Sequence, residues 1–415
     1  MSGFAVSVRA ALTGDGQVLA PAHWVVANGR TVALGVAQGE PQLDALLLPG
    51  LVNAHAHLDL AGAPPVPDQG RFADWLLAVG AARGESADVR AGAACQAAAL
   101  ARRGVVAIGD VDASRGVATA GRRSAGLDGV SYLELVGVGA ESARARLAGA
   151  LDVVNQLGGA VGLSPHAPYS VNSEVLPEIV RAARRRALPL AMHLAESVDE
   201  TRYLTHGDGP FVSFLETIGR GRPFAEAPGA RPIPWADQLG LLRAGCVVIH
   251  GNDLDDDDVA LLGERRARVV YCHGTHQHFS RPAHRLLDLA AAGAQLALGT
   301  DSGVSNDGVD LLAEMGRLAA DRPDVAPQSI IEWATTGGRR ALGQDPEAAS
   351  FAPGSVADGL LLGGLSDDAE ELAAEGLASW ALEGGAAWHA TVHQGRAVFD
   401  ANPVAALLDT LFGQG

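Results

Sequence analysis

Between residues 46 and 303 the chain repeats one pattern, a short apolar run followed by a segment with helical patterning. The eight runs are LLLPGLVNAHAH, VVAIGDVD, SYLELVGV, AVGLSPHAP, LPLAMHLAE, CVVIHGND, RVVYCHGT and LALGTDSG. Strands that are apolar throughout and alternate with helices form parallel sheets that are covered on both faces. The repeat therefore predicts an α/β fold with a closed (β/α)8, or TIM, barrel.

The segments on either side of this repeat have a different pattern. Residues 4–36 and 352–400 alternate in hydropathy and turn like short antiparallel strands. Because chain termini lie near each other in many folds, we expect both ends to build one small β-sandwich-like domain. The predicted boundaries are residues 1–48 and 352–415 for the small domain and 49–351 for the barrel.

Composition and charge exclude several classes of protein. The chain has 415 residues, of which 48% are hydrophobic and 19% charged, as expected for a globular protein with a sizeable core. Its net charge of −17 argues against a nucleic-acid partner, which would require a basic surface. The N-terminus lacks the pattern of a signal peptide, and no run of about 18 apolar residues could cross a membrane. We expect a cytoplasmic protein with no membrane partner. The sequence leaves open whether the protein forms a homodimer.

Basic and sulfur-containing residues narrow the chemistry further. The chain contains no lysine, so all 31 of its basic residues are arginine. This excludes mechanisms that need an amine, such as Schiff bases, and metal sites bridged by a carboxylated lysine. The sequence predicts buried thiols rather than disulfides for three widely spaced cysteines, Cys95, Cys246 and Cys272.

Polar residues recur where the predicted strands end. His55 and His57 are separated by one residue, so a strand would direct both imidazoles to the same face. Barrel enzymes place their chemistry at the C-terminal ends of the strands. The polar residues expected at this rim are His55, His57, His166, His193, Glu196, His250 and Asp301.

This set of residues suits a divalent metal. Three imidazoles and a carboxylate can bind Zn²⁺ or Fe²⁺ and leave one coordination position for water. Such an ion lowers the pKa of its water toward neutrality, and Glu196 is placed to move the proton. Each signal also has a structural interpretation: an exposed histidine pair, a helix start at HLAE, and a turn with an Asp N-cap in GTDSGVSND. Their occurrence together and in this order favours the metal site.

The ordered segments PGLVNAHAHLDL, SPHAPYSV, HLAESVDE, VVIHGNDLDDDD, LALGTDSGVSNDGVDLLAEM and FAPGSVADGLLL resemble the amidohydrolase superfamily. The resemblance is to the branch of chlorohydrolases and amino-heterocycle deaminases. It implies one divalent metal on His55, His57, His193 and Asp301, with Glu196 as proton shuttle and His250 as hydrogen-bond partner of the intermediate. It also implies catalytic participation of Asp301. Since binuclear members commonly use a lysine on strand 4, the absence of lysine favours a mononuclear deaminase.

The same resemblance assigns residues to substrate binding. His166 matches the position that contacts the substrate, and Glu134 in YLELVG is a second candidate, although it could equally pair with an arginine. The seventh run, YCHGTHQHFSRP, departs from the family pattern. Its histidines, His273, His276 and His278, could form a second metal site, but a rim of the substrate pocket is the simpler interpretation.

Within the branch the chain resembles the aminodeoxyfutalosine deaminases of the alternative menaquinone pathway. The segments that carry this resemblance are FADWL, HLAESVDETRYL, GDGPFVSFLE and TDSGVSNDGVDLLAEM. Their substrate is an adenine nucleoside with a carboxylated aromatic group, so an arginine fork is expected from Arg71, Arg202 or Arg281. Each of these arginines could instead be an ordinary surface residue.

We therefore predict a metal-dependent hydrolytic deaminase of a purine-like amino-heterocycle that releases ammonia, with a small-molecule partner. Alternative substrates within the same fold are S-adenosylhomocysteine or adenosine-like nucleosides, triazines and formimino compounds. A non-catalytic binding barrel is a further alternative, which the complete set of ligands and Glu196 disfavour. Two long loops, 61–73 and 219–235, are expected to be either lids or solvated connectors.

Overall fold

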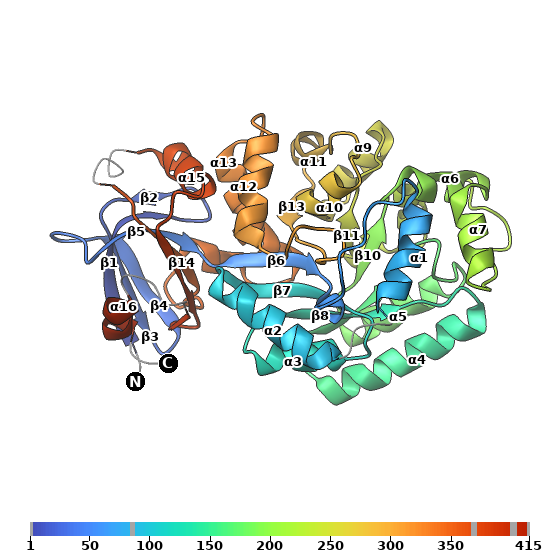
Figure 1. The fold of residues 1–415 in the computed structure, drawn as a ribbon, viewed down its shortest axis with the longest axis horizontal. Coiled ribbons are helices and arrows are strands. Elements are labelled where there is room, and N and C mark those ends of the chain that lie inside the picture. Colours follow the sequence, from blue (N-terminus) through green and yellow to red (C-terminus); the bar gives the residue numbers. More distant parts are fainter. Residues whose placement is uncertain (1–2, 84–87, 367–371, 399–404, 413–415) are drawn as a thin grey trace. The chain divides into compact units, whose positions relative to one another are not determined.

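The computed structural model describes residues 3–83, 88–366, 372–398 and 405–412. The chain divides into two compact units (Figure 1). Unit 1 comprises Met1–Asn53, Ala98–Ile108 and Asp310–Gly415. Unit 2 comprises Ala54–Ala97 and Gly109–Val309. Compactness alone does not show which segments fold independently, so the domain boundaries given above stay a prediction.

Eight strands follow one another in the predicted order and form two four-stranded sheets, β6-β7-β8-β9 and β10-β11-β12-β13. Their bounds are β6 (Leu51–Ala56), β7 (Val105–Asp112), β8 (Asp128–Leu135), β9 (Val161–Pro165), β10 (Ala191–Leu194), β11 (Val247–His250), β12 (Arg268–Tyr271) and β13 (Gln295–Leu298). Two parallel bridges, Leu163 to Leu190 and Ala56 to Asp301, join the sheets at both edges. This closed order of strands is the predicted (β/α)8 barrel.

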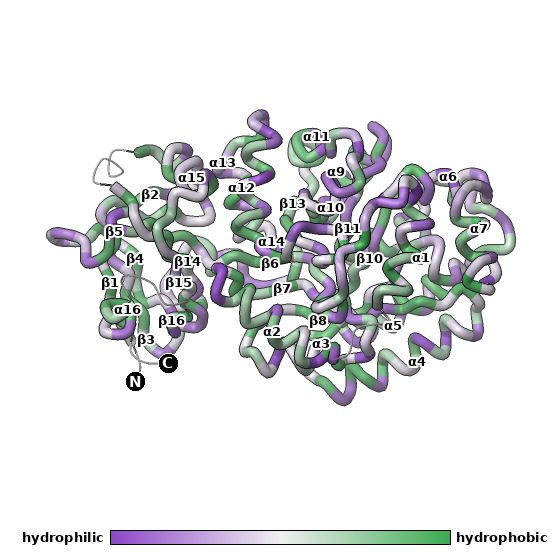
Figure 2. The backbone as a smooth tube through the Cα atoms, in the orientation of Figure 1, coloured by the Kyte–Doolittle hydropathy of each residue, from purple (hydrophilic) through white to green (hydrophobic). Residues whose placement is uncertain are grey.

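Burial explains why the strands are apolar on both faces. Every residue of β7, β9, β10 and β11 is buried, as expected for strands with side chains inside the barrel and under the helices. Helix α4 has instead one buried stripe, Ala143, Leu147 and Ala150, at helical spacing. Figure 2 shows this as alternating apolar and polar residues along α4.

The helices between the strands account for the second half of each repeat. Before β13 they are α1 (Phe72–Arg83), α2 (Val89–Arg102), α3 (Val117–Ser124), α4 (Ala140–Leu157), α5 (Leu176–Arg186), α6 (Val198–His206), α7 (Pro210–Thr217), α8 (Pro232–Gln238), α9 (Asp256–Glu264), α10 (His273–His278) and α11 (Leu286–Ala292). After it follow α12 (Leu311–Asp321), α13 (Pro327–Glu332) and α14 (Gly338–Ala341). Over the described parts of the chain, no helix combines the length and apolarity that a membrane span requires.

Unit 1 contains an eight-stranded sheet from both ends of the chain, in the order β16-β15-β14-β5-β1-β3-β4 with β2 paired to β1. Its strands are β1 (Gly3–Leu12), β2 (Val18–Leu19), β3 (Ala22–Ala27), β4 (Arg30–Val36), β5 (Leu43–Pro49), β14 (Gly359–Gly363), β15 (Trp388–His393) and β16 (Arg396–Val398). Two helices, α15 (Ala374–Leu382) and α16 (Ala405–Phe412), complete the element order. Trp24 is fully buried in its core, packs edge-to-face on Phe4 and Phe351, and donates its indole N–H to Thr31.

Both loops expected to be long are present, and each ends in a helix. The first ends where α1 begins at Phe72, and it is anchored because the Val66 amide donates to the Val304 carbonyl at 2.9 Å. The indole of Trp75 in α1 donates back to the Val66 carbonyl at 3.0 Å. The second loop ends at Pro232, where α8 begins. The anchored first loop holds α1 beside the cavity described below.

A buried ion pair in unit 1 gives a prediction for stability. The Asp358 carboxylate accepts hydrogen bonds from Arg339 and His393, both at 2.9 Å. Burial raises the pKa of Asp358, but these two partners outweigh burial, so the pKa lies below its ordinary value. We expect Asp358→Ala to lower the free energy of unfolding by about 3–5 kcal/mol, because a buried guanidinium loses its partner. Urea denaturation at neutral pH measures the loss.

Acid provides a second measurement on the same variant. The stabilisation from Asp358 is fully present above the unfolded carboxyl pKa and is lost as pH falls through the lower folded pKa. The difference between the wild type and Asp358→Ala should therefore shrink in acid. The control is Asp324→Ala, whose exposed pair with Arg322 at 2.7 Å should contribute less than about 1 kcal/mol. Equal losses in both variants would contradict the prediction.

Candidate metal centre and active site

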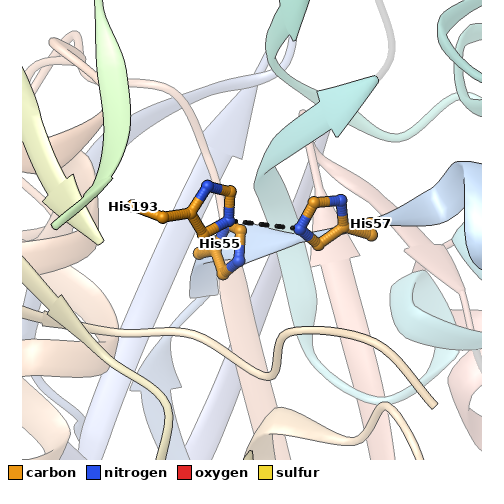
Figure 3. A group of neighbouring side chains, drawn as sticks. All are labelled: His55, His57 and His193. Atoms are coloured by element: carbon orange, nitrogen blue, oxygen red, sulfur yellow. Dashed lines mark hydrogen bonds between the residues drawn. The ribbon is translucent and has the colours of Figure 1, made fainter. Parts of the chain in front are cut away.

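Three imidazoles from two strands of the barrel that are not adjacent, β6 and β10, face one another (Figure 3). His55 lies in β6, His57 is the first residue after β6, and His193 lies in β10. The Nε2 atoms of His57 and His193 are 3.3 Å apart. Two nitrogens bound to one tetrahedral zinc ion at about 2.0–2.1 Å would be separated by about 3.3–3.4 Å. This spacing fits a shared metal ion.

The fourth predicted ligand reaches the same place from the end of β13. The Asp301 Oδ1 atom lies 3.6 Å from His55 Nε2 and 3.8 Å from His57 Nε2. His55 is 1% exposed, and both of its ring nitrogens lack a hydrogen-bond partner among the described residues. Because a buried nitrogen without a partner is costly, the unprotonated ring nitrogen is suited to a metal ion that accepts its lone pair. The residues present therefore fit a divalent metal.

The close approach of two segments places Asp301 beside His55. A Cβ atom on Gly299 would lie 2.9 Å from both the Cβ and the carbonyl oxygen of His55, so a larger residue there would push the segments apart. The amides of Thr300 and Asp301 donate to that carbonyl at 3.0 and 3.1 Å. Glycine in the segment GTDSG therefore has a packing reason, because it lets the carboxylate reach the metal site.

Three of the segments that carry the site contain a residue with left-handed backbone. Ala195, His250 and Asp301 have positive φ angles of 51°, 74° and 56°. Left-handed backbone of this kind costs a non-glycine residue of the order of 1 kcal/mol or more, and it occurs often at functional sites. Ala195 directly follows β10 and precedes Glu196, His250 ends β11, and Asp301 lies three residues after the end of β13.

Hydrogen bonds and charges orient the imidazoles. His193 Nδ1 lies 3.0 Å from the His166 carbonyl, so its proton occupies Nδ1 and Nε2 is left for a ligand. His57 Nδ1 lies 3.7 Å from the Asp59 carboxylate. Burial lowers the pKa of His57, but Asp59 and Asp301 outweigh it and raise that pKa to about 9. Since a histidine binds a metal only as the neutral imidazole, binding of a cation would displace a proton from His57.

Glu196 combines burial with a position beside the cluster. It follows β10, is 5% exposed, and its Oε1 atom lies 3.6 Å from His250 Nε2. Burial raises the pKa of Glu196 to about 8, although Arg281 opposes the rise. Burial also lowers the pKa of His250 well below its usual value, so this imidazole is neutral. A carboxyl group with a pKa near neutrality can both accept and return a proton.

A cavity of about 520 Å³ opens over this cluster. The predicted residues that line it are His57, Glu134, His166, His193, Glu196, His250 and Asp301. Glu134 Oε1 lies 3.9 Å from His166 Nε2, and His166 Nδ1 lies 2.7 Å from the hydroxyl of Ser170. These two residues are therefore placed to contact a substrate bound in front of the metal ligands.

Three residues predicted to bind substrate are absent from the described lining of the cavity: Arg71, Arg202 and His276. Arg71 is exposed beside Asp74, and Arg202 is exposed and bonded to Asp208 at 2.7 Å. His276 is buried, and its Nδ1 lies 3.1 Å from Asn252 Oδ1. A role for these three in direct substrate contact is not supported by the geometry.

The seventh strand leads into a helix rather than a metal site. His273, His276 and His278 lie on α10, and His273 Nδ1 is 3.0 Å from the Tyr271 hydroxyl. Among the described residues, no group of three metal-ligating side chains at ligating separation includes any of them. Arg281, which follows the helix, packs over the rings of Phe72 and Phe279 with its guanidinium carbon 5.2 and 4.6 Å from their centroids. The alternative of a second metal site is not supported.

Sequence reasoning missed several residues that line the cavity. They are apolar side chains of α1, of α7 and of the residue after α7, and two arginines, namely Phe72, Trp75, Phe214, Ile218, Arg146 and Arg220. FADWL marked the first of these segments, but nothing in the sequence distinguishes Arg146 or Arg220 from other surface arginines. Their position depends on how α4 and the segment after α7 are rotated, which the pattern of the chain does not determine.

Comparison with known proteins shows the family to which the sequence is similar. Residues 46–385 match the model of the amidohydrolase family. The 5-methylthioadenosine/S-adenosylhomocysteine deaminase of Haloarcula marismortui is 31% identical over 336 residues, which cover 75% of this chain and 72% of that protein. The aminodeoxyfutalosine deaminase of Deinococcus radiodurans is 28% identical over 360 residues, which cover 80% and 84%.

A solved structure extends the likeness to the whole fold. The crystal structure of an adenosine deaminase from Xanthomonas campestris with bound zinc superposes with a TM-score of 0.74 and 21% identity, covering 99% of this chain and 97% of that one. The chain belongs to the amidohydrolase family. The predicted resemblance, the barrel fold and the enzyme class of metal-dependent hydrolytic deaminase are thereby confirmed.

Proposed function

We propose that this enzyme deaminates an adenine nucleoside with a carboxylated group, and that 6-amino-6-deoxyfutalosine of the menaquinone pathway is its substrate. The observation that carries the proposal is one cavity lined by three of the four proposed metal ligands, Glu196, apolar side chains of α1 and α7, and Arg146 and Arg220. Apolar walls suit an aromatic group, and arginine suits a carboxylate. The likeness to the Deinococcus radiodurans deaminase supports the same substrate.

The residues of the chain divide the reaction among them. A divalent ion on His55, His57, His193 and Asp301 would polarise water and lower its pKa, and either Zn²⁺ or Fe²⁺ suits these ligands. Glu196 takes a proton from the attacking water and delivers it to the ring nitrogen next to the amino-bearing carbon. His250 donates a hydrogen bond to the oxygen that gains charge. The proton remaining on that oxygen passes to the amino group, and the carbon–nitrogen bond breaks to release ammonia and the keto heterocycle. His166 and Glu134 hold the nucleoside in front of these groups.

A second candidate substrate is S-adenosylhomocysteine, together with 5-methylthioadenosine. The relative from Haloarcula marismortui, which is 31% identical, favours it. S-adenosylhomocysteine also carries a carboxylate, whereas 5-methylthioadenosine and adenosine carry none. Ammonia release from 6-amino-6-deoxyfutalosine and these three nucleosides separates the candidates. Preferred turnover of the first supports the proposal, and preferred turnover of S-adenosylhomocysteine replaces it by the second candidate.

Removing the lining arginines should affect only carboxylated substrates. We expect Arg146→Ala and Arg220→Ala to raise KM for the carboxylated substrate by about 10-fold, since a hydrogen bond to a charged group contributes about 1.5–3 kcal/mol. Turnover of adenosine should change less than about twofold, given that exposed charges away from a bound group contribute little. Steady-state kinetics of ammonia release measures both effects.

Arg144→Ala is the matched control for this prediction. Arg144 lies on α4, as Arg146 does, and its side chain pairs with Glu178 at 2.8 Å. It is outside the described lining of the cavity. Its removal should leave both substrates unaffected. An equal rise in KM for adenosine in the Arg146→Ala and Arg220→Ala variants would show that these arginines shape the cavity rather than bind a carboxylate.

A further inference from the structure

The segment that carries Glu196 is held by polar contacts on both sides of its backbone. Glu200, four residues along on α6, directs its carboxylate back to this segment. Its Oε1 atom accepts the Ala195 amide at 3.0 Å, and its Oε2 atom accepts the Glu196 amide at 2.9 Å. Glu200 is fully buried, and both of its oxygens are therefore used to hold two successive peptide groups.

The carbonyl groups of the same two residues are held from another strand. The amides of Asn252 and Asp253, which follow β11, both donate to the Ala195 carbonyl at 2.8 Å. The Asn252 side-chain amide donates to the Glu196 carbonyl at 3.2 Å. All four backbone groups of Ala195 and Glu196 thus have a partner. Together these contacts stabilise the left-handed conformation of Ala195, whose φ is 51°.

His276 completes this arrangement from α10, the helix that follows β12. Its Nδ1 lies 3.1 Å from Asn252 Oδ1, so the Nδ1–H tautomer donates and fixes which way the Asn252 amide points. Burial lowers the pKa of His276 to about 4, which keeps its imidazole neutral near pH 7. His276, which was predicted from the sequence to bind substrate, is thereby connected to Glu196 through one intervening side chain.

We propose that Glu200, Asn252 and His276 are positioning residues that fix the Glu196 carboxyl group at the reacting atoms. Glu200 makes the direct contact with the segment, Asn252 makes the second, and His276 acts through Asn252. This inference rests on the proposed role of Glu196 as proton shuttle. It explains why the seventh strand departs from the family pattern: its histidine supports the acid–base residue instead of binding substrate or metal.

The first test is Glu200→Gln, which keeps size and removes one acceptor oxygen while placing an NH2 group against a backbone N–H. We expect kcat for ammonia release to fall by about 10²-fold, the loss typical of a small misplacement of a catalytic group. KM and the metal bound per chain should stay unchanged. Asn252→Ala and His276→Leu should give smaller losses in that order, and His276→Gln, which can still donate, should restore part of the loss of His276→Leu.

Ser197→Ala is the matched control. The Ser197 hydroxyl accepts the Glu200 amide at 3.2 Å as N-cap of α6, so its loss should destabilise this helix by about 1 kcal/mol without removing a contact to the Ala195 or Glu196 amides. If Glu200 served only the stability of α6, Ser197→Ala and Glu200→Gln would lower kcat equally. That result would overturn the proposal.

Two further measurements separate this proposal from the proposed function. In a Glu196→Gln background, Glu200→Gln should have almost no additional effect on kcat, since residues that act through one group are not additive. Additive losses would overturn the positioning role, and full activity of Glu196→Gln would overturn both proposals. Hydrogen exchange at the Ala195 and Glu196 amides gives a readout without catalysis. It should accelerate in Glu200→Gln and not in Ser197→Ala, and unchanged exchange would contradict the proposal.

Discussion

Replacing Glu196 by glutamine is expected to lower kcat by about 10²–10⁴-fold, the range typical for removal of a general acid–base group. Glutamine has the same shape but cannot take a proton from water and return it to the substrate. Glu196 is not among the four proposed ligands, so the metal bound per chain should stay the same. Ammonia release and elemental analysis of the same preparation measure the two quantities together.

A buried carboxyl group elsewhere provides the control for Glu196. Glu314 on α12 is 1% exposed and pairs with Arg317 at 2.5 Å. Glu314→Gln alters a buried charge in unit 1 and should leave kcat unchanged. A Glu196→Gln enzyme that keeps more than about a tenth of wild-type kcat would be incompatible with a proton-transfer role of the expected size.

Loss of one metal ligand should have an effect of similar or greater size. We expect His193→Ala to weaken metal binding by more than about 100-fold, since even loss of an outer hydrogen bond to a ligand costs about 10- to 100-fold. Activity should fall in proportion to the bound metal. Measuring metal content and ammonia release over a series of added zinc and iron concentrations tests the prediction and distinguishes the two ions.

His206→Ala is the corresponding control, because His206 lies in the last turn of α6 and is not one of the candidate metal ligands. It should bind metal and release ammonia as the wild type does. Removal of the ion from the wild type by a chelator should abolish activity, and addition of the correct ion should restore it. A chelated enzyme that stays fully active would contradict a metal-dependent reaction.

The barrel and most of the predicted rim follow from strand ends, which is why the sequence predicted them well. The C-terminal ends of parallel barrel strands lie at the same rim. The apolar runs that end near His55, His193 and His250 were therefore enough to place these residues there. Because one residue separates His55 and His57, both imidazoles were expected on the same face of the strand. Asp301 needed Gly299 as well, and both occur in the segment GTDSG.

Residues that act through long side chains or through backbone contacts could not be predicted in the same way. Arg71 and Arg202 were chosen for their loops, yet their guanidinium groups pair with nearby acids. Arg146 contributes to the cavity because of the rotation of α4. The role that we propose for Glu200 depends on a left-handed turn at Ala195, which has no signature in residue type.

The buried imidazole cluster also has a thermodynamic consequence for the whole barrel. The four proposed ligands come from distant parts of the chain, so the complete site exists only in the folded state, and the ion binds that state preferentially. Such an ion adds about 2.7 kcal/mol of stability when its free concentration is about 100 times its Kd. The melting temperature should therefore rise with the concentration of free metal. Metal supply would then set how much folded protein a cell keeps, and not only how fast that protein works.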